Sequence, residues 1–280
     1  MKWQHRLTFY SAIVLLTLGA VARADSRIEK HLKLEPGGKF VLEASGGDAT
    51  VTGTPESGAR VVITSNRDDL ESLFDFRFEE APGIARVVAH KRIMTAPPED
   101  FKLRFEVQVP TRTSLEMKTG GGDVHASRLE GEFDLHTSGG DVELSDLTGN
   151  VEARTAGGDI TLRHVKGDAQ VGTSGGDVRV DSASGQVVAH TSGGDVEVAF
   201  ARGNARGGEI ETSGGSIEVA LDPAVNLSLD VSASGGELTT DLPMKVAGRI
   251  NHSSLQGTLG AGGETLRLHT SGGDIHLRGL

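Results

Sequence analysis

The feature that most constrains this chain is a Gly-Gly-Asp-Val or Gly-Gly-Asp-Ile tetrad that returns every 18 residues between Thr113 and Gly203. Its copies are Gly121–Val124, Gly139–Val142, Gly157–Ile160, Gly175–Val178 and Gly193–Val196. A fixed period near this length is typical of folds that stack equivalent units along one axis. The centre of the chain is therefore expected to be repetitive and elongated.

Apolar residues occupy every second position on both sides of the tetrad. In the third repeat, Val151 and Ala153 precede the tetrad. Ile160 is its last residue, Leu162 lies two positions further on, and Val165 lies three positions after Leu162. Successive side chains of an extended chain point to opposite faces, so this alternation predicts two short strands per unit. Glycine is expected at the corner between them because it enters positive φ without a Cβ clash.

Strands of this length cannot bury their apolar face within one unit. Stacking equivalent strands of successive units ~4.8 Å apart would pair their backbones and form a continuous core. An antiparallel sandwich of hairpins gives no reason for identical columns from unit to unit. The sequence therefore predicts an all-β fold, a single-stranded parallel β-solenoid (β-helix) with coils of 18 residues and an irregular β cap at its N-terminus.

The first 24 residues have the organisation of a secretory signal peptide. Lys2 and Arg6 precede an apolar run that ends in Ala22-Arg23-Ala24, an A-x-A cleavage pattern. Without any acidic residue, this segment carries Lys2, Arg6 and Arg23, so its removal takes the net charge from −11 to −14. That charge argues against nucleic acid and anionic membranes as partners. The chain has no cysteine, which excludes attachment of a lipid through a thiol.

The mature chain, residues 25–280, is expected to form one β-solenoid domain. Residues 25–112 would hold the N-terminal cap and first coils, with strands such as 40–44, 60–65, 74–78, 85–90 and 101–109. Residues 113–203 are the regular repeats, and residues 204–280 are irregular C-terminal coils. The last tetrad, Gly272–Ile275, lies 37 residues after the preceding Gly-Gly corner, which predicts one coil near Leu255 that has lost its marker.

The aspartate of each tetrad is the first candidate for chemistry. The column consists of Asp123, Asp141, Asp159, Asp177 and Asp195. Each carboxylate could accept hydrogen bonds from backbone N–H groups of its own corner, or the column could hold a row of Ca²⁺ ions, which prefer oxygen ligands. The first explanation is favoured because the calcium-binding β-roll repeat places its glycine and aspartate residues differently.

Other site chemistry is sparse. A threonine column at positions 119, 137, 155, 173 and 191 has the inward parity of the core, and its hydroxyls are expected to bond to one another or to turn carbonyls. The sequence contains no nucleophile elbow, phosphate loop or thiol, and its histidines lack metal-ligand spacing. The only Trp and Tyr, Trp3 and Tyr10, lie in the signal segment. The mature chain therefore lacks the aromatic residues on which sugars usually stack, which argues against a carbohydrate-binding groove. No catalytic residue, cofactor or metal is predicted.

The repeated Thr-Ser-Gly-Gly-Asp-Val at 137–142, 173–178 and 191–196 and the ending Leu-Arg-Leu-His-Thr-Ser-Gly-Gly-Asp-Ile-His-Leu at 266–277 resemble a large bacterial family. It is a domain of unknown function often labelled "putative adhesin". The resemblance covers residues 28–277. It implies a β-solenoid in the envelope or at the surface, and supplies no ligand or catalytic residue.

These observations favour an exported, non-enzymatic β-solenoid that acts as an adhesin-like binding or scaffold protein in the periplasm or at the cell surface. The expected partner is an envelope protein, a surface polymer or another copy of the chain, with no membrane span after signal cleavage. Two alternatives stay open. One is a β-helix enzyme acting on extracellular polysaccharide, and the other is a calcium-stabilised structural module.

Overall fold

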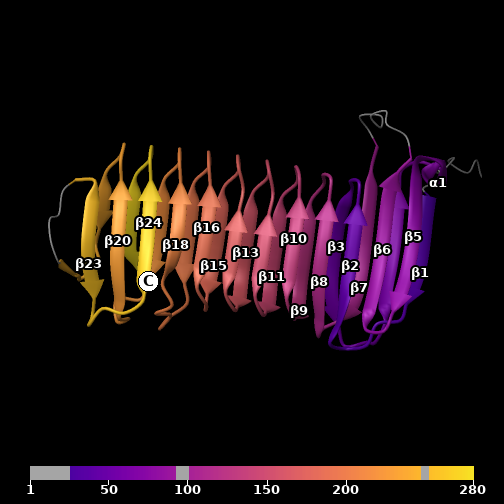
Figure 1. Cartoon of the computed structure of the whole chain (residues 1–280), viewed down its shortest axis with the longest axis horizontal. Coiled ribbons are helices and arrows are strands. Elements are labelled where there is room, and N and C mark those ends of the chain that lie inside the picture. Colours follow the sequence, from indigo (N-terminus) through magenta and orange to yellow (C-terminus); the bar gives the residue numbers. More distant parts are fainter. Residues whose placement is uncertain (1–25, 93–100, 247–251) are drawn as a thin grey trace, which may run out of the picture.

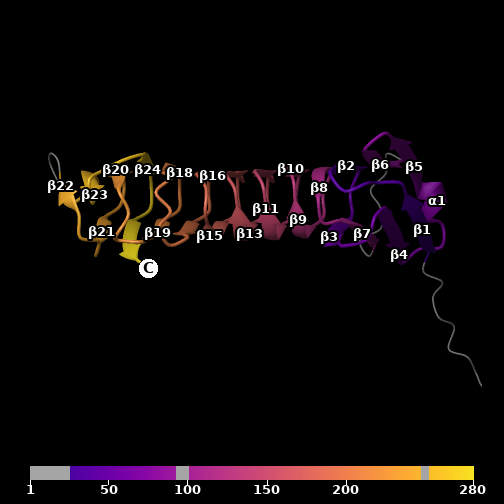
Figure 2. The same ribbon diagram turned by 90° about the horizontal axis from the view of Figure 1, so that it is seen from below.

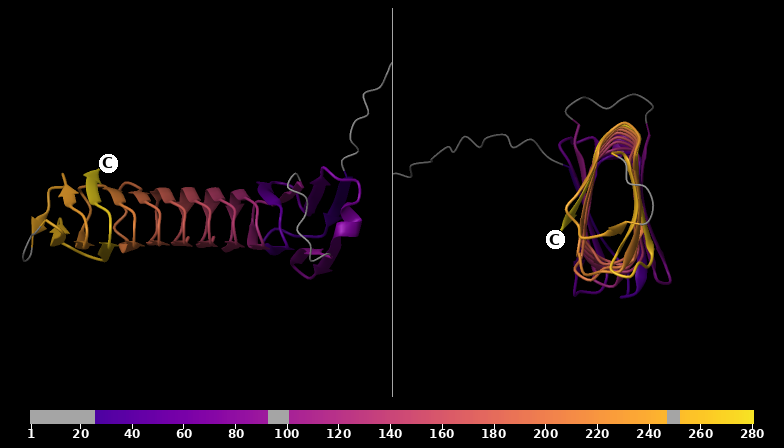
Figure 3. Two further views of the ribbon diagram at one scale, coloured as in Figure 1. Left: turned by 90° about the horizontal axis from the view of Figure 1, so that it is seen from above. Right: turned by 90° about the vertical axis from the view of Figure 1, so that its left-hand side faces the viewer.

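The computed structural model describes residues 26–92, 101–246 and 252–280, so the predicted signal peptide lies outside the described residues. The described chain is an elongated, all-β molecule with one short helix, α1 (Leu70–Leu73). It consists of two facing sheets of 12 and 13 strands, here called sheet A and sheet B. Figure 1 shows the strands side by side along the long axis, and the end-on view in Figure 3 shows the two sheets enclosing one narrow interior.

The regular repeats alternate between the two sheets. Sheet B receives β8 (Thr113–Thr119), β10 (Phe133–Thr137), β12 (Val151–Arg154), β14 (Ala169–Gly172) and β16 (Val187–Thr191). Sheet A receives β9 (Val124–Glu130), β11 (Val142–Thr148), β13 (Ile160–Lys166), β15 (Val178–Ala183) and β17 (Val196–Phe200). One strand of each sheet with the Gly-Gly corner between them is called a unit below.

Equivalent positions of successive units lie directly beside one another. Strand β13 pairs in parallel with β11 and β15, which places Ile160 between Val142 and Val178. All three side chains are buried. The long, mostly parallel sheets and the dry interior expected from the sequence are therefore confirmed.

Four of the five sheet-A strands of the regular repeats, β9, β11, β13 and β15, contain a residue in the left-handed region. Arg128, Asp146, His164 and Ser182 have φ of 60°, 54°, 55° and 57°. Each stands immediately before the last apolar column, which is why that column follows after three residues instead of two. A non-glycine residue in this region costs of the order of 1 kcal/mol, and here it returns Leu129, Leu147, Val165 or Ala183 to the core.

The second glycine of the corner is required by close packing more than by its φ angle. A Cβ on Gly158 would lie 2.2 Å from the carbonyl oxygen of Gly140 in the neighbouring unit, and one on Gly176 would meet Gly158 equally closely. Neither residue has positive φ, in contrast to Gly47 and Gly122 at the N-terminal end of the column. The expectation that these corners need glycine for positive φ is therefore wrong for most of the regular repeats.

The N-terminal end is closed by strands that are out of sequence order (Figure 2). Besides α1 it contains β1 (Ser26–Leu32), β2 (Gly38–Ala44), β3 (Asp48–Thr54), β4 (Ala59–Ser65), β5 (Phe74–Ala81), β6 (Ile84–Lys91) and β7 (Leu103–Pro110). The unit β2–β3 lies between β6–β7 on one side and β8–β9 on the other. We call it the N-terminal interleaved unit. Antiparallel β1, β4 and β5 continue the sheets beyond it.

The C-terminal end repeats this arrangement. Its strands are β18 (Gly208–Thr212), β19 (Ile217–Leu221), β20 (Leu227–Ala233), β21 (Leu238–Thr240), β22 (Lys245–Val246), β23 (Ser254–Leu259), β24 (Thr265–Thr270) and β25 (Ile275–Gly279). The last unit, β24–β25, lies between β18–β19 and β20–β21, and we call it the C-terminal interleaved unit.

The expected unmarked coil near Leu255 is therefore wrong. Residues 254–259 form β23, which pairs antiparallel with β20. The final Gly-Gly-Asp corner turns back to lie against the corner at Gly214-Gly215, since a Cβ on Gly273 would be 2.2 Å from the carbonyl oxygen of Gly215. Spacing along the chain could not reveal this because stacking order and sequence order differ here.

Candidate binding surface

The aspartate column forms a hydrogen-bonded ladder that runs from unit to unit. Oδ1 of Asp141 accepts the backbone N–H of Asp159 at 2.8 Å, and Oδ1 of Asp159 accepts that of Asp177 at 2.8 Å. The acceptor thus serves the next unit, whereas the sequence led us to expect donors within the same corner. Asp123, Asp177 and Asp195 make equivalent bonds to the units that follow them.

The ladder continues through both interleaved units. Asp48 accepts the N–H of Asp123 at the N-terminal end. At the other end Asp274 accepts the N–H of Glu237, although Glu237 precedes it in sequence. Between them the hydroxyl of Ser216 accepts the N–H of Asp274 at 3.2 Å, so a serine carries out the role of the missing aspartate. The column is accounted for by this structural role along its whole length.

The threonine column performs the corresponding task on the inner side of the corner. Thr155 donates from Oγ1 to the carbonyl oxygen of Gly140 at 2.9 Å and accepts the N–H of Gly158 at 3.3 Å. Thr173 and Thr191 do the same in the next units. These side chains are buried, and the predicted bonds to turn carbonyls are confirmed.

A second ladder, which the sequence analysis missed, follows the opposite corner. Oδ1 of Asn150 accepts the N–H of Asp168 at 3.1 Å, and Oδ1 of Asp168 accepts the N–H of Gln186 at 2.8 Å. Ser114 does the same for Glu132 through its hydroxyl. The signal in the sequence was a second glycine column, at positions 131, 149, 167 and 185, with a polar residue directly after each glycine. These polar residues differ in type and so attracted less notice than the aspartates.

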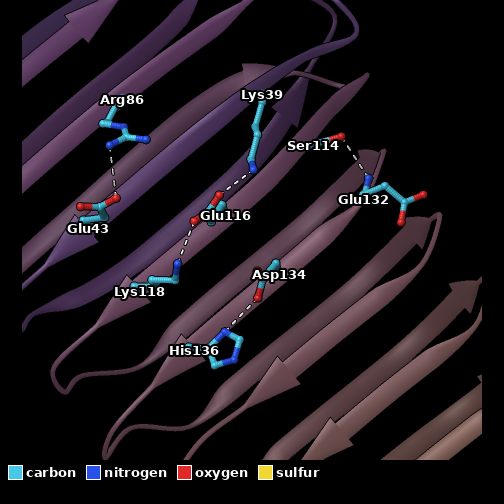
Figure 4. A network of polar contacts seen from close by, with 9 residues as sticks. All are labelled: Lys39, Glu43, Arg86, Ser114, Glu116, Lys118, Glu132, Asp134 and His136. Atoms are coloured by element: carbon cyan, nitrogen blue, oxygen red, sulfur yellow. Dashed lines mark hydrogen bonds and ion pairs between the residues drawn. The ribbon is translucent and has the colours of Figure 1, made fainter.

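The outer face of sheet B carries charge pairs along its strands (Figure 4). Lys118 contacts Glu116 at 2.9 Å, and Arg154 contacts Glu152 at 2.6 Å. Asp134 Oδ1 and His136 Nδ1 lie 2.9 Å apart, and both atoms are shielded from solvent. Acidic side chains of neighbouring strands thus lie beside a lysine, a histidine or an arginine two positions further along the same strand.

Glu116 is a carboxylate of this face that lies between two lysines. Lys39 of β2 approaches it at 2.5 Å from the neighbouring strand, and Lys118 approaches it along its own strand. Hydrogen bonds from Lys39 and Lys118 lower the pKa of Glu116 to about 2. Hydrogen bonding to Glu116 in turn raises the pKa of Lys118.

An open groove of about 470 Å³ crosses the outer face of sheet B between the second ladder and the charged rows. Its floor is formed by Leu115, Phe133 and Val151, whose side chains point into the core. Polar side chains of successive units form its walls, and they are Lys39, Glu132, Asp134, Glu152, Asp168 and Gln170. A groove of this kind offers carboxylates and amides at regular strand spacing to an extended partner.

Within residues 26–92, 101–246 and 252–280, no group of three or more histidine, cysteine, aspartate or glutamate side chains is placed to hold a metal ion. None of the helices in the same residues is long and apolar enough to cross a membrane. The outward histidines instead meet single carboxylates, as His125 does with Glu143 and His164 with Asp146.

Solved structures of similar architecture come from bacteria. One, described as a "putative adhesin" from Bacteroides fragilis, has 15% identity and a TM-score of 0.54, covering 93% of this chain and all of that one. Another "putative adhesin", from Parabacteroides distasonis, has 10% identity and a TM-score of 0.47, covering 90% of this chain and 97% of that one. At 15% identity the likeness to the Bacteroides fragilis structure concerns the fold alone.

Among curated proteins, the chain has no significant match. Its family is nevertheless clear from the sequence, because residues 39–278 match the domain described as Toastrack DUF4097. That match spans the interleaved units at both ends as well as the regular repeats between them, so the chain belongs to the Toastrack DUF4097 family.

Proposed function

We propose that this protein is exported by its signal peptide and acts in the periplasm or at the cell surface as a non-enzymatic, adhesin-like binding protein. The scaffold is a β-solenoid with 18-residue coils, and the binding surface is the outer face of sheet B. The partner is an envelope protein or a surface polymer. The observation that carries this proposal is the groove of about 470 Å³ on that face.

The groove is suited to an extended partner because its walls repeat. Glu132, Asn150, Asp168 and Gln186 lie at the start of successive strands, and each unit adds the same kind of polar group ~4.8 Å further on. The two corner ladders hold the strands that carry these groups. A surface that is rigid before binding loses little conformational entropy on association.

The charge of the groove favours some classes of partner over others. The groove contains the carboxylates of Glu132, Asp134, Glu152 and Asp168 and one lysine, Lys39, at its end, and of these carboxylates Glu152 is paired with Arg154. A nucleic acid would meet repulsion from these groups and from the net charge of the mature chain. A partner rich in hydroxyl, amide or cationic groups would meet complementary acceptors.

The experiment compares two triple-lysine variants of the mature chain that change its charge equally. Gln170→Lys, Gln186→Lys and Val188→Lys alter the groove. Ser127→Lys, Ser145→Lys and Thr161→Lys alter outward positions of sheet A. Both are tested for co-sedimentation with cell-envelope fractions of the source bacterium, after melting curves have shown that they are folded.

We expect the groove variant to lose binding and the sheet-A variant to retain it. Equal binding by both variants would refute the groove as the binding surface, and failure of the unaltered chain to bind would refute the adhesin-like role. Release of reducing ends from envelope polysaccharide, abolished by one or two single substitutions, would instead establish the enzymatic alternative.

A further inference from the structure

The C-terminal interleaved unit is the last structured element of the chain, yet it is not at the end of the stack. Strand β24 pairs in parallel with β18 on one side and with β20 on the other. Strand β25 pairs likewise with β19 and β21. The unit therefore fills a slot between two units that precede it in sequence.

The contacts that fill this slot are those of the repeat itself. Leu268 lies between Ile210 and Val231, and all three are buried. Thr270 donates to the carbonyl oxygen of Gly215 at 2.8 Å, and Asp274 accepts the N–H of Glu237 at 2.8 Å. All of these contacts are made by residues 265–279, and none involves the segment that connects them to the preceding strand.

A single short connection ties this unit to the rest of the chain. After β23, residues 260–264 cross the end of β20 to the start of β24. Gly260 and Gly262 have φ of 56° and 77°, and Asn226 Oδ1 accepts the N–H of Ala261 at 2.8 Å. Within the described residues, the segment beyond the connection is held by its strands, by its corner and by the bonds of Gly279 and Leu280 to Asp241 and Leu221.

We propose that the C-terminal interleaved unit is exchanged between two copies of this protein, so that residues 265–279 of one copy occupy the slot of the other. The partner is a second copy because the slot fits a Thr-Ser-Gly-Gly-Asp-Ile corner flanked by alternating apolar residues, and this chain supplies that segment. Exchange of an identical element makes the same contacts in the dimer as in the monomer, so it costs little.

The N-terminal interleaved unit shows why the exchange is confined to one end. Strands β2 and β3 fill an equivalent slot, but the chain continues from them through β4, β5, β6 and β7 before it reaches β8. Exchange of β2–β3 would require all of these strands to open. The C-terminal unit has no such continuation within the described residues.

The absence of cysteine in the chain allows a direct test with engineered thiols. Ser232 of β20 and His269 of β24 are register partners on the outer face of sheet B. A copy with Ser232→Cys and a differently tagged copy with His269→Cys are mixed, unfolded, refolded together at high concentration and oxidised. A disulfide between the two tags forms readily only where β24 of one copy lies beside β20 of the other.

The matched control uses Glu152→Cys and Gln170→Cys, which are register partners in the regular repeats. We expect the Ser232/His269 mixture to give a disulfide-linked dimer well above the control. A doubly substituted chain, Ser232→Cys with His269→Cys, confirms that the geometry permits the bond. If the double variant closes within one chain and the mixture gives no more dimer than the control, the proposal is overturned.

Discussion

Both ends of this molecule contain an interleaved unit, but the chain enters and leaves the two units in opposite order. At each end the strands of one unit lie between strands that are not their neighbours in sequence, so strand order in the sheets differs from strand order along the chain. At the N-terminal end the chain leaves the inserted unit, builds the outer strands and returns. At the C-terminal end the chain builds the outer strands first and inserts its last residues afterwards. In the described residues, the N-terminal interleaved unit is connected to further strands both before and after it, whereas the C-terminal interleaved unit is connected to strands before it.

This difference indicates which end can open independently. The N-terminal interleaved unit is covered by β1, β4, β5 and α1, and Phe40, Phe105 and Leu70 are almost completely buried there. The outermost strands of the C-terminal end, β21 and β22, have three and two residues and are mostly exposed. Regions with few buried contacts open at lower free energy than the rest of a structure, so the C-terminal end is expected to open first.

The largest expected effects come from truncating one core side chain at each end. Phe40→Ala in β2 should lower the free energy of unfolding by about 3–5 kcal/mol. Leu268→Ala in β24 should lower the free energy of opening of the C-terminal strands by about 2–5 kcal/mol. Hydrogen exchange followed by mass spectrometry should show faster exchange over the whole chain for Phe40→Ala. For Leu268→Ala the acceleration should be confined to residues 208–280. Equal acceleration at β2 and β24 in both variants would remove the distinction between the ends.

The corner glycines provide a comparison within one unit. Gly158→Ala places a Cβ 2.2 Å from the carbonyl oxygen of Gly140, whereas Gly157→Ala meets no atom within 4 Å. The first should reduce stability by about 1–3 kcal/mol through overpacking, and the second should change it by less than ~0.5 kcal/mol. Thermal melting of the two variants measures the difference. Gly273→Ala repeats the collision in the C-terminal interleaved unit, where the loss should be local.

The ladder predicts a smaller effect for a single aspartate. Asp159→Ala leaves the backbone N–H of Asp177 without its 2.8 Å acceptor, at a cost of about 1 kcal/mol because water can reach this corner. Asp274→Ala should have the same local cost, visible only in exchange of the C-terminal strands. A loss of stability at Asp159 no greater than that of an outward control, Thr161→Ala, would mean that the ladder does not stabilise the stack.

Calcium should not change the melting temperature. In the ladder, Oδ1 of each regular-repeat aspartate already accepts a backbone N–H. Melting curves in the presence of calcium and of a chelator are therefore expected to coincide. A midpoint that rises with calcium concentration would establish the calcium-stabilised alternative, since a ligand specific for the folded state stabilises it.

A small effect is also predicted for the pH dependence of stability that comes from Glu116. Its pKa is lowered from the ordinary value of 4.5 to about 2 by Lys39 and Lys118, so its stabilising contribution is complete above pH ~4.5 and is lost as the pH falls towards ~2. The contribution is about 1 kcal/mol or less because the pair is partly exposed. Glu116→Gln should therefore flatten the stability profile in that window.

Glu209→Gln is the matched control for this variant, because Glu209 faces Arg267 across the C-terminal junction at a longer distance of 3.5 Å. Urea unfolding at several pH values measures both variants. If the stability of Glu116→Gln fell with pH in parallel with that of the unaltered chain, Glu116 would not be the source of the pH dependence in this window.

The sequence was most informative where order along the chain and order in space coincide. The columns containing Val142, Ile160 and Val178 predicted their register and burial, and the tetrads located the corners. Five strands of the N-terminal cap were also located, but β3 was not among them, and β1 was missed because Arg27, Glu29 and Lys30 mask its alternation. The interleaved units could not be predicted, since a repeat specifies what a unit can stack on and leaves open which copy it meets.

The corner chemistry shows a second limit. Composition identified the aspartates and threonines, but the partner of each side chain lies in another unit, 18 residues away for Asp159 and 37 for Asp274. The glycines were expected for their φ angles, while Gly158 and Gly176 are needed because the neighbouring backbone leaves no room for a Cβ. Both facts depend on stacking distance, which local sequence does not contain.

Disulfide formation between successive units tests the register of the stack most directly. Gln170 and Val188 are register partners on sheet B, and His190 is the partner of Gly172, two positions further along. Direct partners lie ~4.8 Å apart, within the Cα range of a disulfide, whereas diagonal neighbours lie at about 7–8 Å and outside it. The account predicts rapid closure of Gln170→Cys with Val188→Cys and slow closure of Gln170→Cys with His190→Cys. The reverse order, or equal rates, would contradict it.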